Sequence, residues 1–172
     1  MVQRKAKQKT KQKGGAEWSH NHDHRLCIVD ALDRAADLCA GRGARLTSIR
    51  RRVLELIWSS HRPIGAYSLL EVLKQERANA APPTIYRALE FLLEQGLIHR
   101  IESQNAYIGC PNPDPDQQHK GMFLICTVCG NAVELEETKI DRLLRNSASN
   151  QGFVIESRTV EAAGLCPECQ VS

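Results

Sequence analysis

Two pairs of cysteines near the end of the chain are the residues whose type and spacing most clearly suggest chemistry. Cys126 and Cys129 form one C-x-x-C pair, followed by Gly130, and Cys166 and Cys169 form a second pair that begins 37 residues after Cys129. A C-x-x-C turn places two sulfurs on the same side of a tight bend. Two such turns can supply the tetrahedral four-thiolate shell that zinc prefers, with Zn–S bonds of about 2.3 Å. We therefore predict a structural zinc ion at these four cysteines.

Two other uses of these cysteines are a disulfide framework and a redox-active dithiol. The chain has seven cysteines, an odd number, and it opens with no secretory signal, which argues against a secreted disulfide framework. A redox-active C-x-x-C motif usually stands alone beside a βαβ unit instead of being doubled. The doubled spacing favours metal binding, and we expect the protein to reside in a reducing cytoplasm.

The 172-residue chain has room for one domain or two small ones, and its charge is unevenly distributed. Residues 1–13 contain six Lys or Arg and no acidic residue, whereas residues 106–172 contain five basic and nine acidic residues. No apolar run approaches the ~20 residues of a membrane span. The N-terminal part is therefore the better candidate to contact a polyanion.

The first half reads as four helices followed by a β-hairpin. Apolar residues recur with helical spacing over residues 28–40, 47–58, 66–75 and 82–95, with Thr47 as a candidate N-cap of the second helix and Gly96 as the stop of the fourth. Strand-like runs at residues 97–102 and 106–109 are joined by turn residues 103–105. This order describes a winged helix-turn-helix, whose fourth helix would enter the major groove while the hairpin lies along the DNA backbone. A generic small helical domain with a hairpin is the alternative.

The second half reads as a small α/β unit after a proline-rich boundary at residues 111–118. We predict strands at residues 121–126, 132–136 and 153–162 and a helix at residues 138–149 that packs through Ile140, Leu143, Leu144 and Ala148. A unit of this size has a thin core, so zinc is a plausible requirement for folding, and an exposed sheet edge offers a means of forming a homodimer. The predicted fold class is α+β. The predicted divisions are a disordered, basic and histidine-containing extension (1–25), a winged-helix DNA-binding domain (26–110), a hinge (111–120), and a dimerisation and structural-zinc domain (121–172).

With these pieces in order, the chain resembles the ferric uptake regulator family, and most closely its zinc uptake regulator branch. The resemblance is carried by the segments RLTSIR (45–50), AY (66–67) and PPTIYRALEFLLEQGL (82–97), together with the two C-x-x-C pairs. It implies a dimeric, metal-activated transcriptional repressor of zinc-uptake genes that binds an AT-rich inverted repeat. It also places Tyr67, Thr84, Tyr86 and Arg87 at the DNA. A guanidinium such as that of Arg87 can fork onto guanine O6 and N7 or onto a phosphate.

The zinc branch of the family adds a second, regulatory zinc site at the junction of the two domains. This chain has the corresponding residue types in His99, Cys110, His119 and Glu134. One thiolate, two imidazoles and a carboxylate make a plausible tetrahedral zinc shell. Taken one by one, each has an ordinary alternative, such as a phosphate-contacting histidine or a packed cysteine. Two zinc ions per subunit are expected, one structural and one regulatory.

Departures from the family pattern bear on which metal is sensed. Iron-type members carry a histidine-rich run with an aspartate before the first cysteine pair, where this chain has a single histidine. A run with His20, His22, Asp23 and His24 does occur, but it precedes the first helix and reads as a solvated leader or an accessory metal site. A sensor of iron, manganese or nickel is the alternative within the family. A zinc enzyme or thiol reductase is disfavoured because no deaminase-type motif, phosphate-binding loop or dinucleotide fingerprint is present, and we predict no enzymatic activity.

Overall fold

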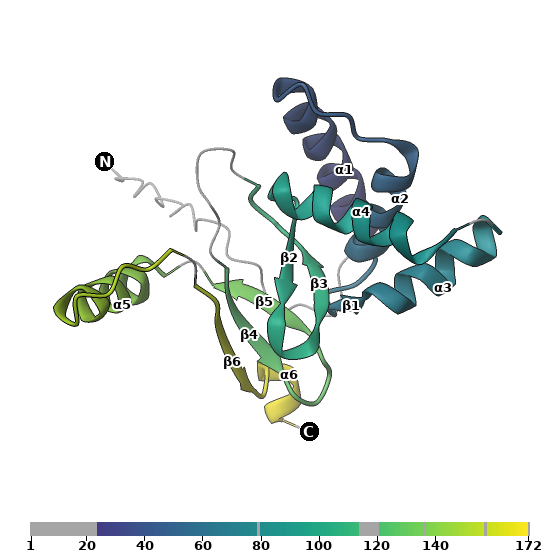
Figure 1. Cartoon of the computed structure of the whole chain (residues 1–172). Coiled ribbons are helices and arrows are strands. Elements are labelled where there is room, and N and C mark those ends of the chain that lie inside the picture. The colour runs from purple at the N-terminus through teal and green to yellow at the C-terminus, as the bar shows by residue number, and fades with distance from the viewer. Residues whose placement is uncertain (1–23, 79, 114–120, 136, 157, 172) are drawn as a thin grey trace, which may run out of the picture.

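The computed structural model describes residues 24–78, 80–113, 121–135, 137–156 and 158–171. The predicted hinge residues 114–120, with His119, and the residues His20, His22 and Asp23 lie outside this part of the chain. A helical half and a sheet-based half flank a central β-hairpin (Figure 1). The described elements, in chain order, are α1 (His24–Gly41), α2 (Ser48–Trp58), β1 (Ile64–Gly65), α3 (Ala66–Glu76), α4 (Pro82–Glu94), β2 (Ile98–Ile101), η1 (Glu102–Gln104), β3 (Ala106–Gly109), β4 (Met122–Cys126), β5 (Ala132–Leu135), α5 (Thr138–Asn150), β6 (Val160–Gly164) and α6 (Pro167–Gln170).

The helical half is held together by one apolar core formed by α1 to α4. The predicted stripe of α4 is confirmed, since its members are at most 2% exposed; they are Ile85, Ala88, Leu89 and Leu92. Pro82 occupies the first turn of α4, where a missing N–H costs nothing, and Gly96 adopts a φ of +68° just beyond the helix end. The first helix begins at His24, inside the segment predicted as a disordered extension.

The second helix differs from the sequence-based expectation in two details. Thr47 occupies the N-cap position of α2 with an extended backbone, but its side chain makes no capping hydrogen bond, and its buried hydroxyl has no hydrogen-bond partner among the described residues. Leu54, which was not assigned to the apolar face, is 1% exposed, whereas the predicted inward residue Leu56 is only partly buried. The cause is that α2 contacts both α1 and α4, so its buried stripe is wider than a one-sided pattern predicts.

The predicted hairpin is present, and it forms the middle layer of the molecule. Strands β2 and β3 pair antiparallel, and β1, which was not predicted, adds to the other edge of β3. Side chains alternate between the two faces of a strand. Ile98 and Tyr107 belong to the core of the helical half, whereas Ile101 and Ile108 belong to a second core shared with β4 and β5. Both faces are therefore largely covered, and the exposed residues of the hairpin are Arg100 and those of the turn around η1.

The C-terminal sheet has the strand order β5-β4-β6, with β4 antiparallel to β5 and parallel to β6. The prediction of a third strand over residues 153–162 is wrong at its start, because the strand is Val160–Gly164. Only these residues find partners along β4, from Met122 opposite Val160 to Cys126 opposite Gly164. Phe153 and Val154 are 66% and 81% exposed and lie outside the sheet.

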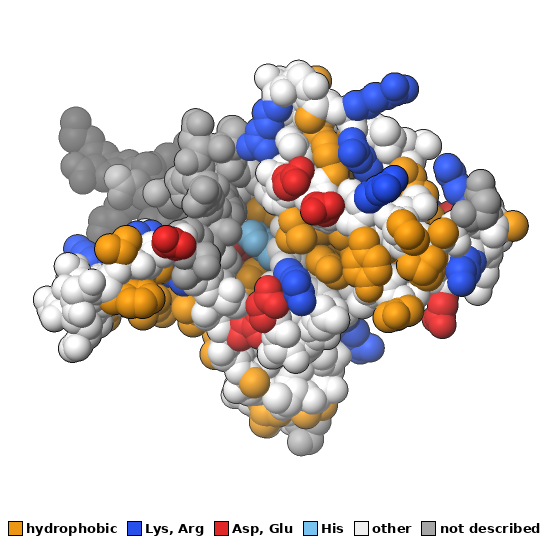
Figure 2. Space-filling view, in the orientation of Figure 1, with side chains coloured by type: hydrophobic (Ala, Val, Ile, Leu, Met, Phe, Trp, Pro, Cys, Tyr) orange, Lys and Arg blue, Asp and Glu red, His pale blue; other side chains and the backbone are white. Residues whose placement is uncertain are grey.

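Helix α5 has the predicted bounds to within one residue, but among the described residues no other element covers its apolar face. Leu143 is 66% exposed, Ile140 and Leu144 are each 38% exposed, and none of the helix's residues is buried. The helix extends away from the sheet (Figure 1), and hydrophobic side chains are visible on its surface (Figure 2). Among the helices of the described residues, none has both the length and the hydropathy of a membrane span.

Candidate metal centres and nucleic-acid interface

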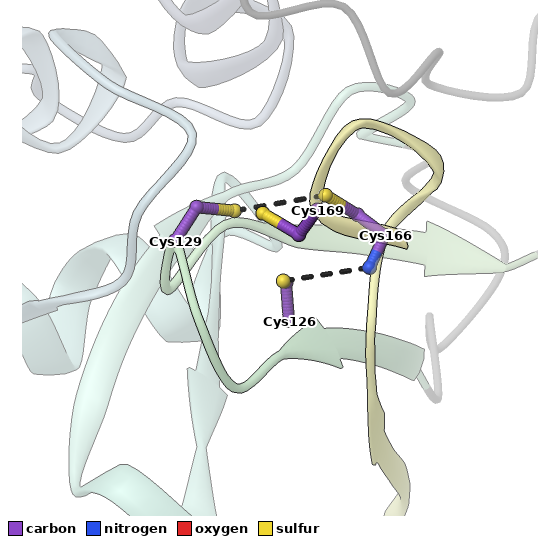
Figure 3. Close-up of side chains that lie close together, drawn as sticks. All are labelled: Cys126, Cys129, Cys166 and Cys169. Atoms are coloured by element: carbon purple, nitrogen blue, oxygen red, sulfur yellow. Dashed lines mark hydrogen bonds between the residues drawn. The ribbon is translucent and has the colours of Figure 1, made fainter. Parts of the chain in front are cut away.

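The four cysteines of the doubled motif come together at one end of the C-terminal sheet. Cys126 is the last residue of β4, and Cys129 follows in a tight turn closed by the hydrogen bond from Gly130 N–H to the Cys126 carbonyl (3.0 Å). Cys166 caps α6, and Cys169 lies within that short helix. Parallel pairing of β4 with β6 brings the two segments together, and all four side chains converge on one centre (Figure 3).

The spacing of the sulfurs suits one tetrahedral metal ion. The Sγ atoms of Cys129 and Cys166 lie 3.8 Å apart, and all four sulfurs lie within 4.8 Å of one another. A tetrahedron with Zn–S bonds of about 2.3 Å has S···S edges of about 3.8 Å. A disulfide would require about 2.05 Å, and none of the seven cysteines, all of which lie in the described part of the chain, is in a disulfide. The four sulfurs could therefore hold zinc.

The four thiols differ in how readily each loses its proton. The backbone N–H groups of Cys129 and Cys166 point toward the Cys126 sulfur, the latter at 3.4 Å, and lower the pKa of Cys126 to about 6. The side-chain contact with Cys166 raises the pKa of Cys169 to about 12, and burial raises the pKa of Cys129. Four neighbouring thiols cannot all ionise without compensation, and a divalent cation supplies it.

A second cluster of donors lies between the hairpin and the C-terminal sheet. His99 sits in the middle of β2, opposite Ile108 of β3, and Cys110 follows two residues after Ile108. Alternation therefore places His99 and Cys110 on the hairpin face that packs on the sheet. Glu134 of β5 lies opposite Phe123 of β4, on the sheet face that meets the hairpin. Side chains from both halves of the molecule thus converge.

The donor atoms of His99, Cys110 and Glu134 all lie within 4.8 Å of one another. His99 Nε2 and Glu134 Oε2 are 3.2 Å apart, and the two side chains are 9% and 8% exposed. Within the described residues, this buried Glu134 oxygen accepts no hydrogen bond. A buried carboxylate oxygen is costly unless a hydrogen bond or a cation compensates it. The donor set of sulfur, nitrogen and oxygen suits zinc more than magnesium or calcium.

Three of the four residues predicted for the regulatory site are brought together by the structure. His119, the fourth, lies outside the described residues. Sequence reasoning missed Phe123, whose ring packs edge-on against the His99 imidazole with the ring centroids 5.3 Å apart. It also missed Gly109, against which the Trp58 indole packs so closely that a Cβ would overlap it. No local signal could identify either residue, because both contacts join distant segments.

Further contacts hold the two halves together beside this cluster. The N–H of Ala132 in β5 donates to the carbonyl of His61 in the loop after α2 (3.0 Å) and so joins the halves, while Arg34 of α1 donates to the carbonyl of Pro111 (2.6 Å) and ties the residue after Cys110 to the helical half. A cavity of about 50 Å³ lies between the halves and is lined in part by Trp58, Gly109 and Glu134. The interface between the two halves therefore contains both direct contacts and a small cavity that Glu134 helps to line.

The predicted DNA-contacting residues lie near the N-terminal ends of α3 and α4. Tyr67, the second residue of α3, is 75% exposed, and Tyr86 is 49% exposed. Arg87 is exposed and Thr84 is half-buried, both within the first two turns of α4. Exposed tyrosines of this kind are available for contact, and helix N-termini attract phosphate. Lysine and arginine side chains are spread over the helical half (Figure 2).

Comparison with known proteins agrees with this architecture. The model of the ferric uptake regulator family matches residues 41–163. The chain belongs to the ferric uptake regulator family. The resemblance inferred from the PPTIYRAL segment and the paired cysteines is thereby confirmed, as is the α+β fold class with an N-terminal winged helix and a small C-terminal α/β domain.

Within the family, the similarity is to zinc uptake regulators. The zinc uptake regulation protein of Escherichia coli (strain K12) is 39% identical over 140 residues, which cover 81% of each chain. A structure described as a zinc uptake regulator complexed with zinc and DNA superposes with a TM-score of 0.79 at 38% identity, covering 84% of this chain and 95% of that one. The crystal structure of holo XcZur superposes with a TM-score of 0.76 at 40% identity, covering 83% of this chain and 99% of that one.

Proposed function

We propose that this protein is a zinc-responsive transcriptional repressor that acts in the cytoplasm on zinc-uptake genes. One observation carries the proposal. Three side chains with the chemistry of zinc ligands, His99, Cys110 and Glu134, come from opposite halves of the molecule and meet at a buried joint. The ligands of such a site come together only when the two halves are in one arrangement. Metal binding at this site would therefore favour that arrangement.

The two candidate metal centres differ in how they are built. All four cysteines belong to the C-terminal half. A metal ion bound there would link β4 to α6 and would have no ligand from the helical half. The cluster of His99, Cys110 and Glu134, called here the joint cluster, takes two donors from the hairpin segment and one from β5. We therefore assign a structural role to the four-cysteine centre and a regulatory role to the joint cluster, with His119 as its fourth ligand. Two zinc ions per subunit follow from this assignment.

A bound zinc ion supplies two positive charges and four directional bonds. His99 and Cys110 fix the hairpin when they are held at one centre with Glu134, and the hairpin is packed on α2 and α4 through Ile98 and Tyr107. The four reading residues Tyr67, Thr84, Tyr86 and Arg87 then have a defined position relative to the C-terminal half. By linkage, DNA that selects this arrangement strengthens metal binding by the same factor, and about 3 kcal/mol corresponds to roughly 150-fold.

A homodimer would present two reading heads to a two-fold symmetric DNA site. The uncovered apolar face of α5 and the outer edges of the β5-β4-β6 sheet support this part of the proposal. The predicted operator is an AT-rich inverted repeat, whose two half-sites mirror the dimer axis. The similarity to a zinc uptake regulator complexed with zinc and DNA supports zinc and double-stranded DNA as the ligands.

The test begins with selection of operator duplexes from a random pool by the zinc-loaded protein, followed by measurement of operator affinity at buffered free zinc. Wild-type protein is expected to bind an AT-rich inverted repeat at least tenfold more tightly with zinc than without it. Cys110→Ala is expected to keep one zinc per subunit and the folded state but to lose this dependence. Equal operator affinity of wild-type protein with and without zinc would refute the proposal. If iron, manganese or nickel raised operator affinity more than zinc does, that metal and not zinc would be the one that the protein senses.

A further inference from the structure

Glu161 of β6 joins the two halves at a second point. Its carboxylate accepts two backbone hydrogen bonds from the hairpin turn, one from Glu102 N–H at 2.7 Å and one from Ser103 N–H at 3.1 Å. Residues 102 and 103 begin η1, directly after β2. The donors belong to the helical half's hairpin and the acceptor to the C-terminal sheet, so the contact spans the joint.

The position of Glu161 in the sheet is what relates it to the candidate metal cluster. Phe123 of β4 lies opposite Glu134 of β5 on one side and opposite Glu161 of β6 on the other. Directly opposed residues of neighbouring strands point to the same face of a sheet. Glu134, Phe123 and Glu161 thus form one row that faces the hairpin. This row contacts His99 through Glu134 and Phe123, and contacts the turn after β2 through Glu161.

The row of Glu134, Phe123 and Glu161 therefore contacts the segment of β2 and the following turn at two places. His99 lies in β2 and Glu102 follows three residues later, so the metal cluster and the Glu161 contact lie along the same strand. Between them, Ile101 packs with Phe123 in the shared core. A second point of attachment along the same strand removes orientations of the hairpin that a single attachment would allow.

We propose that Glu161 is an interdomain latch that positions the hairpin on the C-terminal sheet and thereby assembles the regulatory metal site. The latch contains no metal ligand and is made by side chain and backbone alone. It sets the angle of the hairpin, while His99, Cys110 and Glu134 add metal dependence to the same arrangement.

The chemistry of the contact suits an ionised carboxylate. Burial would raise the pKa of Glu161, but the Ser103 hydroxyl and the N–H groups of Glu102 and Ser103 outweigh it and lower the pKa of this carboxyl group. An ionised carboxylate accepts at both oxygens, and hydrogen bonds to charged groups are the stronger ones. A glutamine would accept at one oxygen only and would turn its amide N–H₂ toward the second donor.

The inference rests on the proposed function, and it makes a distinct claim about coupling. The latch and the regulatory metal favour the same arrangement of the two halves. Loss of the latch lowers the population of that arrangement, so the apparent affinity for zinc at the joint falls by the same fraction. The four-cysteine centre lies within one half and has no such dependence.

The experiment compares Glu161→Gln and Glu161→Ala with wild-type protein and with Glu94→Gln, which removes the same charge from an exposed position at the end of α4. Amide exchange of Glu102 and Ser103 is measured by NMR in metal-free and zinc-loaded protein. Zinc affinity at the joint is measured by chelator competition, and operator affinity is measured at subsaturating free zinc. We expect about tenfold faster exchange of these two amides in both metal states for the Glu161 variants, and about tenfold weaker zinc binding at the joint.

Operator affinity at subsaturating zinc should fall in parallel, while the zinc content of the four-cysteine centre and the behaviour of Glu94→Gln should match wild type. Wild-type exchange rates at Glu102 and Ser103 in both Glu161 variants would overturn the latch. Faster exchange with unchanged zinc affinity at the joint would overturn the coupling. Absence of any zinc effect on operator binding by the wild-type protein would instead refute the proposed function, and the exchange rates would still decide whether the latch exists.

Discussion

Gly109→Ala is a sharp test of how the hairpin is packed beside the regulatory cluster. A Cβ added at Gly109 would lie 2.5 Å from Nε1 and 2.8 Å from Cδ2 of the Trp58 indole, and closer still to Cε2. The backbone of Gly109 has an ordinary negative φ, so alanine is excluded by space and not by conformation. The indole belongs to the last residue of α2 and packs against the helical core, so it must shift toward that core or into the adjoining cavity to admit the methyl group.

The expected cost follows from overpacking. Forcing a methyl group into a filled site costs about 1–3 kcal/mol, and three contacts below 3.0 Å point to about 2 kcal/mol here. For a chain of this size, that cost corresponds to a fall in Tm of about 4–8 °C. Because Cys110 is the next residue, displacement of the strand should also weaken zinc binding at the joint.

Unfolding of the zinc-loaded protein in urea, followed by far-UV circular dichroism, provides the measurement. Gly164→Ala is the matched control, since it lies in a strand, has no atom within 4 Å of its added Cβ and lacks a positive φ; it should be neutral or slightly stabilising. Trp58→Phe should recover part of the loss when combined with Gly109→Ala. Unchanged stability and zinc affinity in Gly109→Ala would refute the packing argument, and so would strictly additive effects of the two substitutions.

Three further substitutions test separate parts of the proposal. Cys126→Ser should remove zinc from the four-cysteine centre and unfold the C-terminal sheet, visible as loss of one zinc per subunit and of amide protection in β4; retention of both would contradict the structural role. Arg87→Ala should weaken operator binding about tenfold or more while zinc content stays constant, and unchanged affinity in a titration would remove Arg87 from the reading helix. Leu143→Asp, at a 66% exposed position of α5, should lower the sedimentation mass from dimer to monomer while the four-cysteine zinc is retained, and an intact dimer would exclude this face as the interface.

The sequence alone was enough to predict the helices and turns that depend on interactions between residues close together in the chain. Apolar spacing in α4, prolines at its start and a glycine after its end predicted that helix, because propensity and capping act over a few residues. The same holds for the hairpin and for the two C-x-x-C turns. Family resemblance then pointed to the residues of the regulatory cluster, although no spacing rule relates Cys110 to Glu134.

Only the tertiary structure decided which side of the hairpin faces which partner. One strand carries Ile98 toward the helical core and His99 toward the C-terminal sheet, and the sequence pattern of a strand buried on both faces does not reveal this. The start of β6 was misjudged because pairing with β4, and not local propensity, sets where that strand begins. The row of Glu134, Phe123 and Glu161 exists only through the register of three strands distant in sequence, so the contacts that join the two halves follow from pairing and not from any local pattern.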